Sequence, residues 1–138
     1  GIWGHAVWPS NAWLGVSVEN QEMMDKRGPI LLDLKRRYNI PVAFLSLEPL
    51  LAPVSLEREY YTEAFRRTWL QDLNWIIVGG ESGAKARPME VSWALDLKRQ
   101  CGKAGVPFFF KQMSAHKNTR YKLLDSFPAQ LCVREFPR

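Results

Sequence analysis

Three apolar runs in this sequence end in the same pattern: a small residue, one spacer and a glutamate. The three triplets are Ser17-Val18-Glu19, Ser46-Leu47-Glu48 and Gly79-Gly80-Glu81. Side chains alternate between the two faces of a strand, so the small residue and the glutamate of each triplet point the same way. Carboxylates placed like this can bind the hydroxyl or amino groups of a ligand, or position a substrate. The sequence therefore predicts a carboxylate at the carboxyl end of each of three strands.

The spacing of these glutamates indicates a parallel α/β arrangement. They lie 29 and 33 residues apart, which is about the length that one strand, one crossover helix and two short loops require. Lys111 and Gln112 follow a fourth apolar run one such interval further along the chain. The carboxyl ends of parallel strands lie along one rim, where sites are built in barrels and in open sheets alike. We therefore expect the candidate site at this rim.

Hydrophobic patterning predicts the elements that position these residues. Strands are expected at 13–18, 42–47, 73–78 and 106–110, and helices at 21–26, from Pro29 to Asn39, at 57–71 and at 90–103. Gly28 and Pro29 predict a break between the first two helices, and Asn39 with Pro41 predicts the end of the second. The 57–71 helix is predicted from Tyr61, Ala64, Phe65 and Trp69, which recur at helical spacing.

Four parallel strands with intervening helices predict the α/β class, as a partial TIM-type (βα) half-barrel. The small residues Gly15, Ser17, Ser46 and Gly79 favour a barrel arc, because small inward side chains leave room for a ligand. Half a barrel has two unprotected edges and an uncovered inner face. We therefore expect a missing N-terminal segment or self-association to cover them. The chain is predicted to be one α/β domain over 1–138, the C-terminal part of a longer partial barrel. Its tail at 113–138 is predicted to be irregular, and 121–138 is expected to pack over one end of the sheet.

Composition narrows the class of protein. The chain has 138 residues, 46% of them apolar and a formal charge of +5, so a packed core is expected. No apolar stretch approaches the roughly 20 residues of a membrane helix, and we expect a cytoplasmic protein without a membrane anchor. Cys101 and Cys132 are too few for a zinc or iron–sulfur site, and no metal site is predicted. The positive charge suits nucleic acid, but dispersed basic residues are also typical of solvated helix faces.

Four longer motifs resemble a known family. They are WLGVSVENQ at 13–21, FLSLEPLL at 44–51, WIIVGGESG at 75–83 with Ala86-Arg87-Pro88, and VPFFFKQ at 106–112. In this order and spacing the sequence resembles a phage-borne family of unknown function with a radical-SAM-like architecture. The resemblance covers most of 10–112, and a weaker match follows at 134–137.

The resemblance implies a partial TIM-type barrel whose full-length members carry an N-terminal three-cysteine motif for a [4Fe–4S] cluster that cleaves S-adenosylmethionine. This sequence has no such motif, so by the resemblance it corresponds to the C-terminal part of such a protein. No cofactor is expected in this chain alone, which should be inactive by itself. No catalytic residue is assigned.

The candidate residues for cofactor or substrate binding lie at the strand ends and in the loops after them. They are Ser17, Glu19, Asn20, Ser46, Glu48, Gly79, Gly80, Glu81, Ser82, Lys85, Arg87, Lys111 and Gln112. The glutamates have an alternative role as helix N-terminal acids, and Asn20 as an N-cap. If the glutamates lie close together, at least one pKa should rise unless Lys111 or Arg87 neutralises them. Only one of Lys111 and Gln112 is expected on the inner face.

The loop at 79–83 has two explanations. With Lys85 and Arg87 it could hold a phosphate or carboxylate on its amides and on the next helix N-terminus. A tight strand-to-helix turn explains the same glycines. Two further hypotheses about the whole chain stay open: a non-enzymatic module that binds nucleic acid or a host protein, and a small hydrolase whose three glutamates bind Mg²⁺.

Overall fold

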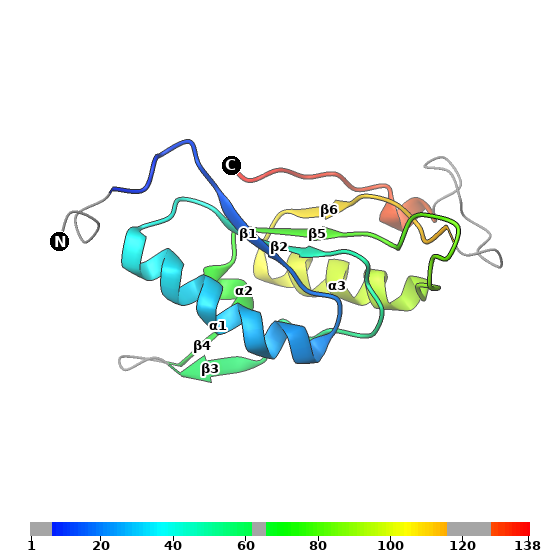
Figure 1. Ribbon diagram of the computed structural model, residues 1–138, viewed down its shortest axis with the longest axis horizontal. Helices are drawn as coiled ribbons and strands as arrows, with labels where there is room; N and C mark the ends of the chain where they lie inside the picture. Colours follow the sequence, from blue (N-terminus) through cyan, green and yellow to red (C-terminus); the bar gives the residue numbers. More distant parts are fainter. Residues whose placement is uncertain (1–6, 62–65, 116–127) are drawn as a thin grey trace.

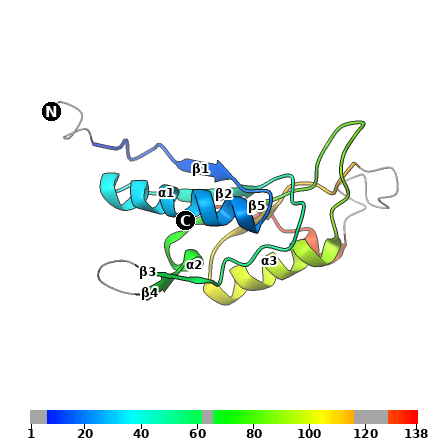
Figure 2. The ribbon, with the colours of Figure 1, turned by 60° about the horizontal axis from the view of Figure 1, so that its bottom comes forward.

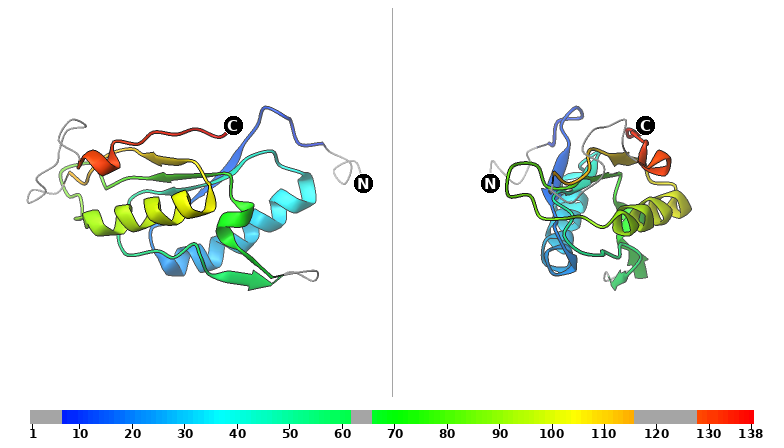
Figure 3. Two further views of the ribbon diagram at one scale, coloured as in Figure 1. Left: turned by 180° about the vertical axis from the view of Figure 1, so that it is seen from behind. Right: turned by 90° about the vertical axis from the view of Figure 1, so that its right-hand side faces the viewer.

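The computed structural model describes residues 7–61, 66–115 and 128–138. Its main sheet has four parallel strands in the order β1 (Leu14–Ser17), β2 (Ala43–Leu47), β5 (Trp75–Val78) and β6 (Phe108–Phe110). The helices α1 (Gln21–Tyr38) and α3 (Val91–Ala104) lie on the same side of this sheet (Figures 1 and 3). The α/β class and the four parallel strands are confirmed, in a form consistent with a partial βα half-barrel.

The two faces of the sheet differ in burial because side chains alternate along each strand. The face toward the helices carries fully apolar side chains that are 2% exposed or less, among them Leu45, Leu47, Ile76, Val78, Phe108 and Phe110. The opposite face carries Phe44, Ser46, Trp75, Ile77 and Phe109, which are all partly exposed. One face therefore forms the core, and the other remains open to solvent among the described residues.

Helix α1 is continuous, so the predicted break at Gly28 and Pro29 is wrong. Pro29 lies inside the helix, although a proline there costs about 3 kcal/mol. Leu31 and Leu32, just after the proline, are buried in the core, and each contributes about 1.5–3 kcal/mol. This burial offsets the cost and keeps the two halves of the helix together. The predicted end is confirmed, because Asn39 caps the helix in the left-handed region with φ 51°.

The predicted helix at 57–71 is wrong. The structure has a hairpin of two antiparallel strands, β3 (Glu59–Tyr61) and β4 (Arg66–Thr68), followed by the short helix α2 (Trp69–Asp72). Thr68 begins this helix, and its backbone N–H donates to the Gln71 side chain at 2.7 Å. Ala64 and Phe65, on which the prediction relied, lie outside the described residues. Aromatic and β-branched residues on both sides of 62–65 favour strands, and cross-strand pairing outweighs the helical spacing.

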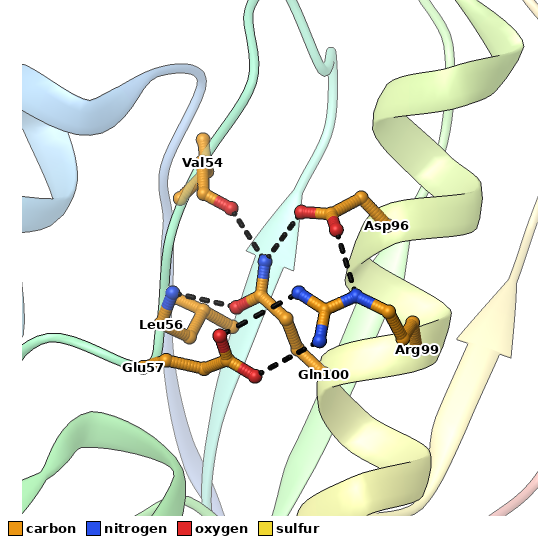
Figure 4. A network of polar contacts seen from close by, with 6 residues as sticks. All are labelled: Val54, Leu56, Glu57, Asp96, Arg99 and Gln100. Carbon is orange, nitrogen blue, oxygen red and sulfur yellow. Dashed lines mark hydrogen bonds and ion pairs between the residues drawn. The ribbon is translucent and has the colours of Figure 1, made fainter.

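A buried glutamine fastens the segment between β2 and β3 to α3 (Figure 4). Gln100 is 1% exposed. Its Oε1 accepts from the Leu56 N–H at 2.8 Å, and its Nε2 donates to the Val54 carbonyl at 3.0 Å and to Asp96 at 2.8 Å. Around it, Arg99 bridges Asp96 and Glu57 at the surface. The network satisfies the buried amide and the backbone groups that the irregular segment leaves unpaired.

The C-terminal segment runs along β6 and does not pack over one end of the sheet. Phe110 N–H donates to Val133 O at 2.8 Å, and Glu135 N–H donates to Phe108 O at 3.0 Å. Before this pairing, the short 3₁₀ helix η3 (Ala129–Leu131) buries Leu131 in the core. One of the two edges predicted to be open is therefore covered by the chain itself. Residues 116–127 of the predicted tail lie outside the described residues. None of the helices in the described ranges is long and apolar enough to cross a membrane.

Candidate functional site

The strand register brings residues from all four strand ends into one row. Ser17 pairs with Ser46, Leu47 with Val78, and Val78 with Phe110. Continuing each register past the strand end places Glu19, Glu48, Gly79 and Lys111 next to one another across the sheet. Backbone hydrogen bonds support this extension, because Gly79 N–H donates to Leu47 O at 3.2 Å and Lys111 N–H to Val78 O at 2.8 Å. We call these four residues the strand-end row.

Each of the three predicted glutamates pairs with a different cation. Arg27 lies 3.5 Å from Glu19, Lys111 lies 3.2 Å from Glu48, and Arg87 lies 2.6 Å from Glu81. The pKa of Glu81 lies below its ordinary value, chiefly because the Arg87 side chain donates hydrogen bonds to it. The glutamates are therefore neutralised as the sequence analysis required, by Arg87 and Lys111 and also by Arg27.

Arg87 pairs with Glu81 and lies within the electrostatic influence of Glu19. Its pKa is raised above the ordinary value by the hydrogen bond to Glu81, and the charge of Glu19 adds to this effect. The chain between β5 and α3, which carries both Glu81 and Arg87, projects beyond the strand ends in Figure 2. The Ser114 hydroxyl holds it there by donating to Arg87 O at 2.6 Å. The predicted residues Ser82 and Lys85 are exposed on this segment.

The alternative role of the glutamates as helix caps is wrong for the helices that the structure describes. Asn20 caps α1, and its side chain accepts from the Met23 N–H at 3.0 Å. Glu90 and Thr68 stand at the N-caps of α3 and α2. No helix begins directly after Glu48 or Glu81. The capping role of Asn20 is confirmed. Glu19 directly precedes this cap and is therefore an acid at the N-terminus of α1, whereas Glu48 and Glu81 need another explanation.

The loop after β5 is shaped by close packing. The amides of Gly79 and Gly80 donate to Leu47 O and Gln112 O, at 3.2 and 2.8 Å, so these amides already have partners. A Cβ at Gly80 would lie 2.2 Å from Ser114 N, which only glycine avoids. Helix α3 begins at Val91, well past the loop. The amides of Gly79 and Gly80 are therefore not free for an anion, and the approach of Ser114 explains the glycine at position 80.

Lys111 and Gln112 both reach the open face. Lys111 Nζ lies 3.2 Å from Glu48 Oε2, while Gln112 Nε2 donates to Gly80 O at 2.9 Å and lies 3.5 Å from Glu48 Oε1. The prediction that only one would do so is wrong, because β6 ends at Phe110 and strand alternation ends with it. Glu48 is thus held from two sides, at 22% exposure of its side chain.

Below the strand-end row, an open pocket of about 610 Å³ lies on the uncovered face of the sheet. Its lining includes four of the residues predicted from the sequence to bind a ligand, Ser46, Glu48, Lys111 and Gln112, and six that were not predicted. The missed residues are Phe44, Trp75, Ile77, Phe109, Arg134 and Phe136. Strand alternation could have identified two of them, because Phe44 stands two positions before Ser46 and Trp75 four positions before Gly79, on the same face of their strands. We call this the aromatic pocket. Ser17, from β1, is exposed beside it on the edge strand.

Two other places in the structure lack the features of a metal or reactive site. Among the described residues, no group of three or more His, Cys, Asp or Glu side chains is placed to hold a metal ion. Burial raises the pKa of Cys101 to about 12, with a smaller effect from Glu135. A second cavity of about 820 Å³ lies at the amino ends of β5 and β6, lined in part by Asn74 and Gly105. It contains none of the strand-end residues.

The fold and site define an α/β protein with a four-stranded parallel sheet, one open face and a polar row at the strand ends. A family model described as a protein of unknown function, DUF5131, matches residues 2–130. The chain therefore belongs to this family, which agrees with the expected membership in a family of unknown function. The comparisons found no matching curated protein and no matching solved structure.

Proposed function

We propose that this chain is the cofactor- and substrate-binding part of a radical-SAM-like enzyme, with S-adenosylmethionine bound at the strand-end row. The observation that carries the proposal is the row itself: Glu19, Glu48, Gly79 and Lys111 stand side by side at the carboxyl ends of parallel strands. They do so on the face that the described helices leave open. Sites of parallel α/β folds form at these strand ends. The resemblance of four motifs to a radical-SAM-like, phage-borne family supplies the choice of cofactor.

The chemistry of the row suits S-adenosylmethionine. Glu48 and Lys111, whose charged groups lie 3.2 Å apart, match the ammonium and the carboxylate of an amino-acid group. On binding, the ion pair between the two side chains would be replaced by one ion pair from each side chain to the ligand. The carboxylates of Glu19 and Glu81 are acceptors for ribose hydroxyl groups. Gly79 keeps the space between Glu48 and Lys111 free of a side chain.

The [4Fe–4S] cluster does not fit this chain. Cys101 is buried and Cys132 is exposed, and two cysteines are fewer than the three or four thiolates that hold such a cluster. Cys132 is the only other cysteine of the sequence. A cluster would have to come from other protein residues, either an N-terminal segment or a separate partner, and we expect the chain alone not to cleave S-adenosylmethionine. Within this proposal the protein acts in the cytoplasm.

Calorimetry of the 138-residue chain with S-adenosylmethionine tests the proposal. Glu48→Gln keeps the shape of the side chain and removes its charge, so the affinity should fall about tenfold, the effect of losing one charge-assisted hydrogen bond. Glu22→Gln on the exposed face of α1 is the matched control and should leave the affinity unchanged. No binding, or equal binding by both variants, would reject the strand-end row as the cofactor site.

Reconstitution tests whether the cluster is held by protein residues outside this chain. The chain is combined with an N-terminal segment or partner that carries three cysteines, and then with iron and sulfide. Visible cluster absorption and release of 5′-deoxyadenosine are expected only in the combined sample. Their absence from the combined sample, in the presence of a strong reductant, would contradict the proposal.

The alternative of a nucleic-acid-binding module has weaker support. Of the three cations that would carry it, Arg87 and Lys111 are paired with Glu81 and Glu48, so most of their charge is compensated. Binding of DNA or RNA that weakens with salt and is abolished by reversing Lys85, Arg87 and Lys111, while Glu48→Gln has no effect, would favour this alternative.

A further inference from the structure

The aromatic pocket has a floor of four aromatic residues: Trp75 and three phenylalanines around it. The ring centroid of Trp75 lies 5.6 Å from that of Phe44, 6.0 Å from that of Phe109 and 5.5 Å from that of Phe136. The Trp75 indole is fixed from its edge, since Nε1 donates to Glu135 O at 2.8 Å. Phe136 remains 60% exposed. Partly exposed rings held in place by one another form a preorganised apolar surface, on which a planar ligand ring can stack.

The charges of the pocket are unbalanced. Glu48 is neutralised by Lys111. Arg134, the other cation, has its guanidinium carbon 5.3 Å from the Phe109 ring centroid, and it donates only to the carbonyls of Phe110 and Lys111, at 3.4 and 3.0 Å. No carboxylate of the described residues pairs with it. The pocket therefore carries one uncompensated positive charge beside an aromatic floor, and an anionic group is the natural counterpart of a guanidinium.

From these two features we propose that the aromatic pocket binds a planar heteroaromatic ring that carries a phosphate group, as in a nucleoside monophosphate. The ring stacks on the floor around Trp75 and Phe109, and the phosphate pairs with Arg134. The Ser46 hydroxyl and the Gln112 amide, both in the lining, supply hydrogen bonds to the polar edge of the ligand. That such a nucleotide is the substrate of the enzyme rests on the proposed function. That the pocket binds it does not depend on that function.

Guanosine 5′-monophosphate is the probe, because its base differs from that of S-adenosylmethionine. Calorimetry of the full chain compares it with guanosine, which lacks the phosphate, and with ribose 5-phosphate, which lacks the ring. The nucleotide should bind at least about tenfold more tightly than either part. In ¹⁵N spectra of the indole groups, the nucleotide should shift the Trp75 signal, assigned with Trp75→Phe, and leave that of Trp93 on α3 in place.

Substitutions separate the two contacts. Arg134→Gln should weaken the nucleotide about tenfold and leave guanosine unchanged. Arg134→Lys keeps the positive charge without the planar guanidinium and should restore part of the loss, which a merely structural role of the guanidinium would not allow. Phe109→Leu should weaken both ring-containing ligands and spare ribose 5-phosphate. Arg99→Gln, which removes a guanidinium from the far side of α3, is the matched control. Urea unfolding of each variant verifies that it folds.

Two results would overturn the inference: equal affinities for guanosine and its monophosphate, or a nucleotide affinity that Arg134→Gln does not change. Its failure is distinguishable from that of the proposed function. Loss of S-adenosylmethionine binding at the strand-end row, with nucleotide binding intact, would reject the function alone. The reverse pattern would reject this inference alone.

Discussion

Two adjacent glycines at the end of β5 should respond in opposite ways to the same substitution. A Cβ added at Gly80 would lie 2.2 Å from Ser114 N and 2.5 Å from Ser114 Cα. These are backbone atoms, so no change of rotamer relieves the clash. A Cβ at Gly79 would lie 3.4 Å from Glu48 Cδ and from Lys111 Cβ, which is close to ordinary contact with two side chains that can yield.

We expect Gly80→Ala to destabilise the protein by about 3 kcal/mol, the upper end of the range for overpacking, because the segment of Ser114 must move. Gly79→Ala should change the free energy of unfolding by less than about 1 kcal/mol, since the reduced freedom of the unfolded chain compensates a small contact cost. For a chain of this size the first change lowers the thermal midpoint by roughly 10 °C.

Urea unfolding followed by tryptophan fluorescence measures both variants on the same day with the same probe. Equal losses in the two variants, or a loss below about 0.5 kcal/mol for Gly80→Ala, would refute the packing argument for this loop. The pair also tests the site, because the alanine of Gly79→Ala enters the space between Glu48 and Lys111. We expect a folded protein with weakened binding of S-adenosylmethionine.

Three further predictions concern the fold and its titrating groups. Gln100→Met should cost about 3 kcal/mol of unfolding free energy, because it leaves the Leu56 N–H and the Val54 carbonyl unpaired. The control Arg99→Gln should cost less than about 1 kcal/mol. Similar losses of unfolding free energy in the two variants would contradict this account. The carboxyl group of Glu81 should titrate below its ordinary pKa of 4.5 in carbon-detected NMR. Because the pKa of Glu81 is lower in the folded than in the unfolded protein, its pairing with Arg87 stabilises the protein above pH 4.5. This contribution is lost as pH falls through the folded pKa. Arg87→Gln should raise the midpoint of the Glu81 titration, and an unchanged midpoint would disprove the pairing. Iodoacetamide should modify the exposed Cys132 in the native protein and Cys101 only after unfolding, and mass spectrometry showing rapid modification of both thiols would contradict the burial of Cys101.

The four strands of the main sheet could be predicted from the sequence because each one is a continuous apolar run. The predicted strand ends agree with the structure to within two residues, and the position of the three glutamates follows directly from them. Helix α3 was equally plain, with Gly105 at its C-cap in the left-handed region. Local patterns were sufficient where burial on one face and local preference agreed.

The errors come from contacts between residues distant in sequence. Nothing local indicates that burial of Leu31 and Leu32 would carry α1 through Pro29, or that pairing of β3 with β4 would displace a helical pattern. The site shows the same limit. Arg134 and Phe136 reach the aromatic pocket only because the C-terminal segment pairs with β6. Arg27 reaches Glu19 from eight residues further along the chain, across the start of α1.

The central claim is that the strand-end row on the open face of the sheet binds the cofactor. Amide chemical shifts of the ¹⁵N-labelled chain, recorded during a titration with S-adenosylmethionine, test it most directly. The account predicts that the shifted amides gather at Glu19, Glu48, Gly79 and Lys111. Shifts gathered instead around Asn74 and Gly105, at the larger cavity on the opposite end of the sheet, or no shifts at all, would contradict it.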